Sequence, residues 1–308
     1  MRPKISESLL VCCKLYISEA RNSFVIESIE RAAKQNNVIV VNKFVDEIYN
    51  RTSYTLVAHS STNSLLDTIP LQNAVTDMVK TALDMIDLRL HEGTHPRLGV
   101  VDHILFHPLG TSTLDKAAEL CKSIAANIGR LLEVPIYLYG AAHSDGRTLD
   151  SIRRDLGYFQ PNSDGRQWIG DPNTDISFVK PDEGPLEVDP SKGLITIGAS
   201  PWVGSCNVPI HSEDIELVKN IARSISEKGG GLPSVQAIGV EHAKGSCEVA
   251  CYLLDLDRVR AGQVQTEVER VCSELGVTVG KVYLTDFLPE EITNLYAKAI
   301  ESCFAERI

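Results

Sequence analysis

The stretch HEGTHPRLG, which begins at His91, holds the side chains best suited to acid–base chemistry in this chain. His91 and His95 stand four residues apart, but Gly93 and Pro96 keep the segment out of a helix, so a helical pair of zinc ligands is not expected. Pro96 also restricts the backbone of His95 to extended conformations. A histidine held in this way suits proton transfer near neutral pH, and Arg97 beside it suits a carboxylate. The alternative is that His95 only caps the preceding helix.

Two further histidines, His103 and His107, follow on a predicted strand. Their even spacing predicts that both face the same side as Val101 and Leu105, whereas Asp102 faces the other side. No cysteine or acidic residue completes a recognised zinc spacing with them. Histidines with partners inside the fold are therefore favoured over a metal site, and no metal is expected.

Other chemistries find less support in the sequence. The glycine-rich stretch GASPWVGSCN, from residue 198, matches neither of the common phosphate-binding loops. Ser18, Ser205 and the cysteines lack the sequence context of an activated nucleophile. Serine or cysteine hydrolase chemistry is therefore disfavoured.

The elements that must position these residues alternate between strand and helix. In the first half, strands are predicted at 8–18, 38–45, 54–58, 100–106 and 135–140, and helices at 22–33, 71–90 and 114–132. In the second half, two strands are predicted around a glycine-rich bend within 195–210, and further strands at 235–242, 248–255 and 277–284. Helices are predicted there at 212–225, 264–275 and 289–305. Between the halves, 143–190 is predicted to form long, partly irregular loops at a functional edge.

Both halves approximate the order β-α-β-β-α-β, which is the split βαβ pattern. The predicted fold class is therefore α/β of the α+β type, with two ferredoxin-like βαββαβ subdomains and mainly antiparallel sheets. The first subdomain is expected to span 1–196 and the second 197–308, and the seam between them is a favourable place for a ligand.

Composition limits the classes of protein further. The chain has 308 residues, 43% of them hydrophobic, and a formal net charge of −11. Nucleic acid is disfavoured as a partner because its binding depends on neutralising phosphates. No apolar run is long enough for a membrane span, and no signal peptide is recognised. The eight cysteines lie mostly in apolar runs without a CxxC pair, which favours buried free thiols in a reducing, cytoplasmic compartment.

The segment HEGTHPRLGVVD (91–102) resembles the motif H-K-G-E-H-P-R-M-G-A-L-D of the formiminotransferase domain found in glutamate formimidoyltransferase and formiminotransferase-cyclodeaminase. Similar pieces occur in the same order over nearly the whole chain: LVCCKLYISEARN (10–22), NRTSYTLV (50–57), VPIYLYGAA (134–142), PDEGP (181–185), GASPWVGSCNV (198–208) and VQAIGV (235–240). The chain is identified as a diverged, formiminotransferase-only member of the cyclodeaminase-like type.

The resemblance implies which residues would form the site. It puts the catalytic histidine of the family on His95, and it implies substrate contacts at Arg97, Ser18, Glu19, Asn50 and Asn207. The folate-binding loop maps onto Gly184, Pro185, Leu186, Glu187, Val188, Asp189, Pro190, Ser191, Lys192 and Gly193. The family fold implies a folate tunnel between two subdomains, so we expect the Gly184–Gly193 loop to lie within reach of the His95 loop across the seam.

Several residues depart from the family pattern. Tyr16 stands where the family has asparagine, Ala20 replaces glycine, Phe44 replaces an aspartate, Ser200 replaces an arginine and Tyr252 replaces an asparagine. The nearest acid to the lost aspartate is Asp46. Loss of an arginine removes a cation suited to glutamate carboxylates, and loss of an aspartate removes a partner for proton transfer.

The resemblance implies a transferase that moves a formimino, or formyl, group between glutamate and tetrahydrofolate, with tetrahydrofolate as co-substrate. The expected partners are reduced folates and glutamate-type small molecules, and a homodimer is compatible with the sequence. The retained HPRLG loop favours an enzyme. The departures favour the alternatives, which are a folate-binding or regulatory protein with reduced catalysis and a trafficking protein, since the resemblance also implies peripheral association with the Golgi.

Overall fold

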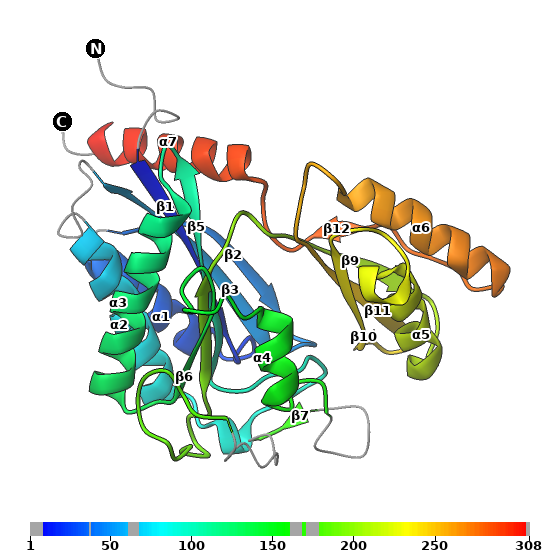
Figure 1. The fold of residues 1–308 in the computed structure, drawn as a ribbon, viewed down its shortest axis with the longest axis horizontal. Coiled ribbons are helices and arrows are strands. Elements are labelled where there is room, and N and C mark those ends of the chain that lie inside the picture. The colour runs from blue at the N-terminus through cyan, green and yellow to red at the C-terminus, as the bar shows by residue number, and fades with distance from the viewer. Residues whose placement is uncertain (1–8, 37, 61–67, 161–167, 171–178, 306–308) are drawn as a thin grey trace. The chain divides into compact units, whose positions relative to one another are not determined.

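The computed structural model describes residues 9–36, 38–60, 68–160, 168–170 and 179–305. The chain divides into two compact units, of which the first comprises Met1–Ser200 with Pro289–Ile308 and the second Pro201–Leu288. Figure 1 shows both as mixtures of helices and strands.

The first unit is built on a six-stranded sheet in the order β2-β3-β1-β5-β8-β6. Its strands are β1 (Leu9–Ile17), β2 (Ile39–Asp46), β3 (Arg51–Ser60), β5 (Val101–Gly110), β6 (Ile136–Gly140) and β8 (Ile195–Ala199). Neighbours from β2 to β5 are antiparallel, whereas β8 is parallel to both β5 and β6. The sheet is therefore mostly antiparallel, with a parallel extension at one edge.

The helices α1 (Ser23–Gln35), α2 (Ile69–Met85) and α3 (Leu114–Leu132) pack side by side on one face of this sheet. Asn22 caps α1 by accepting a hydrogen bond from the backbone N–H of Val25, and Thr113 caps α3 through Lys116. Each helix buries an apolar stripe against the strands, so one face of the sheet becomes the core.

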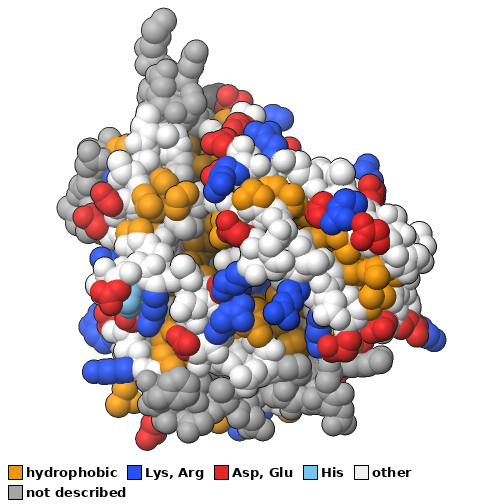
Figure 2. Space-filling view, turned by 45° about the vertical axis from the view of Figure 1, so that its right-hand side comes forward, with side chains coloured by type: hydrophobic (Ala, Val, Ile, Leu, Met, Phe, Trp, Pro, Cys, Tyr) orange, Lys and Arg blue, Asp and Glu red, His pale blue; other side chains and the backbone are white. Residues whose placement is uncertain are grey.

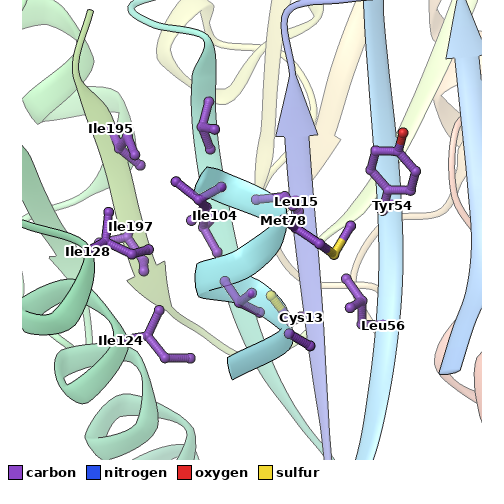
Figure 3. Packing of buried hydrophobic residues seen from close by; sticks show 14 of the residues in the cluster. Cys13, Leu15, Tyr54, Leu56, Met78, Ile104, Ile124, Ile128, Ile195 and Ile197 are labelled. Carbon is purple, nitrogen blue, oxygen red and sulfur yellow. The ribbon is translucent and has the colours of Figure 1, made fainter. Parts of the chain in front are cut away.

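Alternation along β1 separates this core from the opposite face of the sheet. Cys13 and Leu15 point toward the helices, where they meet Tyr54, Met78 and Ile104 (Figure 3). Lys14 and Tyr16 occupy the alternate positions and so project from the other face. That second face carries the polar side chains from which the site is built.

Short elements surround the site. They are the 3-10 helix η3 (Leu88–Leu90), the strands β4 (Glu92–Gly93) and β7 (Trp168–Ile169), and the helix α4 (Leu149–Asp155). The last helix, α7 (Pro289–Ala305), returns to the first unit and packs against β2 and β5.

The second unit has a four-stranded antiparallel sheet in the order β10-β11-β9-β12. Its elements are β9 (Gly204–Ile210), α5 (Ile215–Ile225), the 3-10 helix η4 (Glu227–Gly229), β10 (Val235–Ala243), β11 (Ser246–Leu253), α6 (Ala261–Glu274) and β12 (Tyr283–Leu284). The helices α5 and α6 cover one face over a separate apolar core.

The α+β class with mostly antiparallel sheets is confirmed. The division of the chain differs from the predicted boundary between 196 and 197 in two ways. The strand β8 completes the first sheet, and β9 begins the second, so the chain changes units at the bend between them. The helix α7 lies within the predicted second subdomain, but its contacts with β2 and β5 make it part of the first unit.

The described residues also show whether any helix could span a membrane and in what state the cysteines are. None of the helices in these parts of the chain is long and apolar enough to cross a membrane. The seven cysteines whose side chains are described are buried free thiols: Cys12, Cys13, Cys121, Cys206, Cys247, Cys251 and Cys272. The side chain of Cys303 lies outside the described residues.

Replacement of Leu15 by alanine tests the core of the first unit. Leu15 is fully buried. We expect Leu15→Ala to lower the free energy of unfolding of this unit by about 2–5 kcal/mol, because it removes buried methyl groups and leaves a cavity. Chemical denaturation followed by circular dichroism measures the change. Leu131 of α3 is 57% exposed, so Leu131→Ala is the control that should leave stability nearly unchanged.

Candidate functional site

The loop that carries His95 is held between short strands and turns. The 3-10 helix η3 ends at Leu90 with His91 as its C-cap, and β4 then pairs with β7, with Gly93 opposite Trp168. The segment is not helical, as predicted from its glycine and proline. His91 and His95 therefore do not lie on one face of a helix, as a helical pair of zinc ligands would.

Arg97 fixes the shape of this loop from inside. Its guanidinium is buried, and Nη2 donates to the carbonyl oxygens of His95 at 2.7 Å and Tyr49 at 3.0 Å. Gly93 allows this packing, because a Cβ there would lie 2.5 Å from Arg97 Nη2. Burial is the main cause that lowers the pKa of Arg97 to about 9. This geometry favours a structural role for Arg97 over the carboxylate clamp that the sequence suggested.

The imidazole of His95 is part-buried and has a defined tautomer. Its Nδ1 lies 2.8 Å from the carbonyl oxygen of Pro96, which can only accept a hydrogen bond, so Nδ1 carries the proton and Nε2 carries the lone pair. No hydrogen-bond partner of Nε2 occurs in the described parts of the chain. The rings of Tyr49 and Tyr158 stand edge-on to the imidazole, with centroids 5.1 and 6.4 Å away. Nε2 is thus an available base.

Burial and positive charge together keep this imidazole neutral. Burial is the largest cause that lowers the pKa of His95 well below its usual value, and the next is Arg51, whose Nη1 lies 3.5 Å from His95 Nδ1. Of the three arginines that lower this pKa, Arg51 therefore has the largest effect. Arg51 belongs to the motif NRTSYTLV (50–57).

A fully buried carboxylate, that of Asp102, holds the arginines in place. Its Oδ2 accepts from Arg51 at 2.9 Å and from Arg153 of α4 at 3.3 Å. Its Oδ1 accepts from the backbone N–H of Leu98 at 2.8 Å. One side chain thus ties a strand, a helix and the His95 loop together.

A β-bulge aims Asp102 at this position. Tyr16 of β1 pairs with His103, whereas the next residue, Ile17, pairs with Val101, so Asp102 is the additional residue on β5. As a result Val101 packs in the apolar core, and Asp102 and His103 both lie close to the same two arginines. The predictions that Asp102 and His103 face opposite ways, and that His103 shares a side with Val101, are therefore wrong.

The site carries more positive than negative charge. Three guanidinium groups, from Arg51, Arg97 and Arg153, lie close enough to lower the pKa of His95, and Asp102 is the buried carboxylate that pairs with two of them. The formal charge of the chain is −11, and both signs of charge are interspersed on the face seen in Figure 2. The charge of the site is thus opposite to that of the whole chain and suits an anionic ligand.

Three predicted contacts lie near this loop, and their side chains form hydrogen bonds with the backbone. The Ser18 hydroxyl donates to the carbonyl of Gly99 at 2.8 Å. Glu19 accepts from the backbone N–H groups of Arg21 and Asn22, which directly precede α1. Asn50, whose φ is +51°, accepts from Ala20 N–H through Oδ1 and donates to Glu92 O through Nδ2. All three therefore make backbone hydrogen bonds that shape the surrounding loops.

An open depression of about 520 Å³ lies beside these residues. It is lined by Glu19, Arg21, Asn22, Ser23, Asn50, Leu90 and Glu92. His95 is not part of this lining. Two of the predicted substrate contacts, Glu19 and Asn50, thus border a surface depression on the first unit.

Asn207, the remaining predicted contact, lies on β9 of the second unit. Its Nδ2 donates to Glu248 Oε2 at 3.0 Å, and the hydroxyl of Tyr283 donates to the same carboxylate at 2.8 Å. His242 Nδ1 lies 3.3 Å from the other oxygen of Glu248. These side chains form a polar row across the sheet of the second unit.

The predicted folate-binding loop, Gly184–Gly193, belongs to the first unit. Gly184 packs against Val134, since a Cβ there would lie 2.2 Å from the Val134 carbonyl oxygen. At the other end, the carbonyl of Lys192 accepts from Val100 N–H at 2.9 Å, next to the bridge between Gly99 and Gly193. The end of this loop therefore lies against the residues that follow Arg97, within one unit.

No cluster of three or more His, Cys, Asp or Glu side chains able to hold a metal occurs within the described residues. Burial is also the largest cause that lowers the pKa values of His91, to about 2, and of His103. The imidazoles around this site are therefore neutral near pH 7, and none supplies a fixed charge.

Comparison with known proteins identifies the family of this chain. The family model of the formiminotransferase domain, N-terminal subdomain, matches residues 10–200, and this match ends where the long run of the first unit ends. The chain belongs to the formiminotransferase family. It is 49% identical over 289 residues to the formiminotransferase cyclodeaminase-like protein of Arabidopsis thaliana, covering 94% of this chain and 96% of that one.

Two other relatives extend this comparison. Glutamate formimidoyltransferase of Streptococcus pyogenes serotype M1 is 30% identical over 75% of this chain and 72% of its own length. Formimidoyltransferase-cyclodeaminase of Rattus norvegicus is 29% identical over 92% of this chain, but the match covers only 50% of that longer protein.

Two of the site residues that were not predicted from the sequence could have been found in its motifs. Arg51 and Asp102 both lie inside motifs quoted for the family resemblance, so their positions were visible even though their pairing was not. Arg153 and Tyr158 lie in and after α4, in a stretch without clear periodicity, and no local signal singles them out. Only the packing of α4 brings them to the site.

Removal of the charge on Asp102 tests the framework of the site. We expect Asp102→Asn to lower the free energy of unfolding of the first unit by about 3–5 kcal/mol, because two buried guanidinium groups lose their shared carboxylate. Chemical denaturation measures this change. Asp84→Asn removes an exposed carboxylate paired with Lys80 and should leave stability unchanged. Equal stability of both variants would contradict the central role of Asp102.

Proposed function

We propose that the protein transfers a formimino group, or a formyl group, between glutamate and tetrahydrofolate. The observation that carries this proposal is the neutral imidazole of His95, with its Nε2 available, among guanidinium groups that outnumber the nearby buried carboxylate. Membership of the formiminotransferase family supports it, as does the name of the glutamate formimidoyltransferase relative.

The proposed reaction begins with attack of N5 of tetrahydrofolate on the formimino carbon of N-formiminoglutamate. A bond forms between N5 and that carbon, and the bond from the carbon to the glutamate nitrogen breaks. His95 Nε2 accepts the proton that leaves N5 and gives it to the departing amine, so that glutamate is released. The Nδ1–H bond to the Pro96 carbonyl holds the ring in the tautomer that this requires.

The surroundings of His95 suit both substrates. The excess of guanidinium charge favours the carboxylates of glutamate and of the folate tail. The rings of Tyr49 and Tyr158 offer apolar surface beside the imidazole for a flat heterocycle. We propose that Ser18, Glu19 and Asn50 border the substrate site, that Asn207 is a substrate contact from the second unit, and that the Gly184–Gly193 loop binds folate.

The finer parts of the proposal go beyond the fold. They include a ferredoxin-like arrangement in each half of the chain, a cytoplasmic location with peripheral association at the Golgi, and partners restricted to reduced folates and glutamate-type molecules.

A binding module with reduced catalysis is the second candidate. Tyr16, which replaces the asparagine of the family, lies under Arg51 with its ring 4.9 Å from the guanidinium carbon. Asp46, the acid nearest to Phe44, accepts from the backbone N–H groups of Ile48 and Tyr49, so it closes a turn. These side chains favour a site that keeps folate while the reaction has changed.

Removal of the His95 imidazole separates the two candidates. We expect His95→Ala to reduce turnover of N-formiminoglutamate by about a hundredfold or more while affinity for tetrahydrofolate changes little, because acid–base groups contribute to the rate rather than to binding. Steady-state kinetics and calorimetry measure the two quantities. The exposed His211 provides the control variant His211→Ala. A wild-type protein that turns over neither N-formiminoglutamate nor 5-formyltetrahydrofolate would retire the transferase and leave the binding module.

The pH dependence of turnover gives an independent test. The pKa of His95 lies well below 6.5, so the ring keeps its basic form as the pH falls through that value, and it gains a proton only at lower pH. We expect turnover to stay level from about pH 8 to about pH 6, where an ordinary histidine would already lose activity. A fall in the kcat profile with a midpoint near 6.5 would contradict a buried, neutral His95.

A further inference from the structure

His103 is a second imidazole near the same arginines, and its ring is held on two sides. It stacks on Tyr16 with centroids 5.3 Å apart and an angle of 17° between the planes. Its Nε2 lies 2.5 Å from the hydroxyl of Tyr139 on β6. Only 1% of the residue is exposed. The ring therefore cannot turn without breaking a hydrogen bond in a closely packed site.

The other ring nitrogen, Nδ1, is buried and has no hydrogen-bond partner in the described parts of the chain. Leaving such a group unpaired costs about 1–3 kcal/mol. A native protein seldom keeps a buried polar atom at a fixed position without a hydrogen bond unless a ligand or another group supplies that bond. The two contacts of the ring hold Nδ1 in one direction, so it has the properties of a preformed ligand contact.

The nearby charges indicate what this ligand is. After burial, the charges of Arg153 and Arg51 are the largest causes that lower the pKa of His103. One carboxylate, that of Asp102, pairs with both arginines. An imidazole among cations stays neutral, so it presents one N–H and one lone pair. A ligand with a negatively charged oxygen would be attracted by the surplus positive charge and would accept a hydrogen bond from Nδ1–H.

Contacts also link His103 to the proposed catalytic group. Arg51 approaches His95 within 3.5 Å and lies over the ring of Tyr16, on which His103 stacks. A carboxylate bound by His103 would therefore be near the reacting group. The α-carboxylate of an N-substituted glutamate meets this condition, because one carbon separates it from the nitrogen that leaves.

We propose that His103 Nδ1–H donates a hydrogen bond to a carboxylate oxygen of the glutamate-type substrate, while the hydroxyl of Tyr139 donates to His103 Nε2. His103 is thus a residue that determines specificity for an amino-acid donor. This inference rests on the proposed function, since it names a group that recognises one of the two substrates of that reaction.

Two substitutions separate a ligand contact from a structural role. His103→Asn places an amide nitrogen close to the position of Nδ1, whereas His103→Gln places a polar atom close to Nε2 and removes Nδ1. We expect His103→Gln to raise the KM for N-formiminoglutamate about tenfold or more, as loss of a hydrogen bond to a charged group does, and His103→Asn to raise it much less. The dissociation constant for tetrahydrofolate should change little in both variants.

A measurement on the unaltered protein avoids any dependence on how the variants fold. In nuclear magnetic resonance spectra of protein labelled with ¹⁵N-histidine, the signals of His103 are those that are missing from the spectra of both variants. Addition of glutamate should shift its Nδ1 signal and leave its Nε2 signal in place. His211→Gln, in the second unit, is the control variant that should keep the wild-type KM.

The outcomes distinguish this inference from the proposed function. If the wild-type protein turns over N-formiminoglutamate but His103→Gln keeps its KM and Nδ1 does not respond to glutamate, the inference fails and the transferase stands. If turnover is absent but glutamate shifts Nδ1, the transferase fails and the carboxylate contact stands. If neither turnover nor a shift occurs, both are overturned. An increase in KM for His103→Asn but not for His103→Gln would assign His103 a structural role through Tyr139.

Discussion

The guanidinium groups of Arg51 and Arg153 converge on the single carboxylate of Asp102, which is shielded from solvent. Each arginine comes from a different element, Arg51 from the start of β3 and Arg153 from α4, and the same carboxylate also accepts from Leu98 in the His95 loop. The relative positions of strand, helix and loop in the site thus depend on one side chain. A bulge in β5 makes this possible, because it turns Asp102 away from the position that regular alternation would give it.

The arrangement also explains why His95 is a neutral base. Burial of the ring is the main reason that the imidazolium ion is disfavoured. The positive charge of Arg51, Arg97 and Arg153 adds to this effect, since one buried carboxylate pairs with two of these arginines. Arg97 donates to backbone carbonyls rather than facing a ligand, so it contributes the shape of the loop. A substrate that brings negative charge would be attracted, and the same charge would keep the imidazole ready to accept a proton.

Two of the residues that depart from the family pattern, Tyr16 and Ser200, contact histidines of β5. Tyr16 lies between Arg51 and His103, so one replacement changes the shape of the site next to both. Ser200 accepts from His107 Nδ1 through its carbonyl oxygen, a contact for which its side chain is not needed. The charge that an arginine would have supplied at Ser200 is absent, whereas Arg51 and Arg153 remain. The site therefore keeps its acid–base framework with altered surroundings.

The amino-acid sequence by itself determined the α+β class, the order of elements and the loop on which His95 lies, because periodicity, glycine and proline act locally. It also made Arg51 and Asp102 visible as parts of motifs. The tertiary structure alone decided how they are used. A bulge depends on the pairing of two strands, so the direction of Asp102 and His103 could not be read from alternation. The position of Arg153 depends on where α4 packs, and the return of α7 to the first unit depends on its contacts with β2 and β5. Long-range packing of this kind leaves no local pattern, since the residues involved are far apart along the chain.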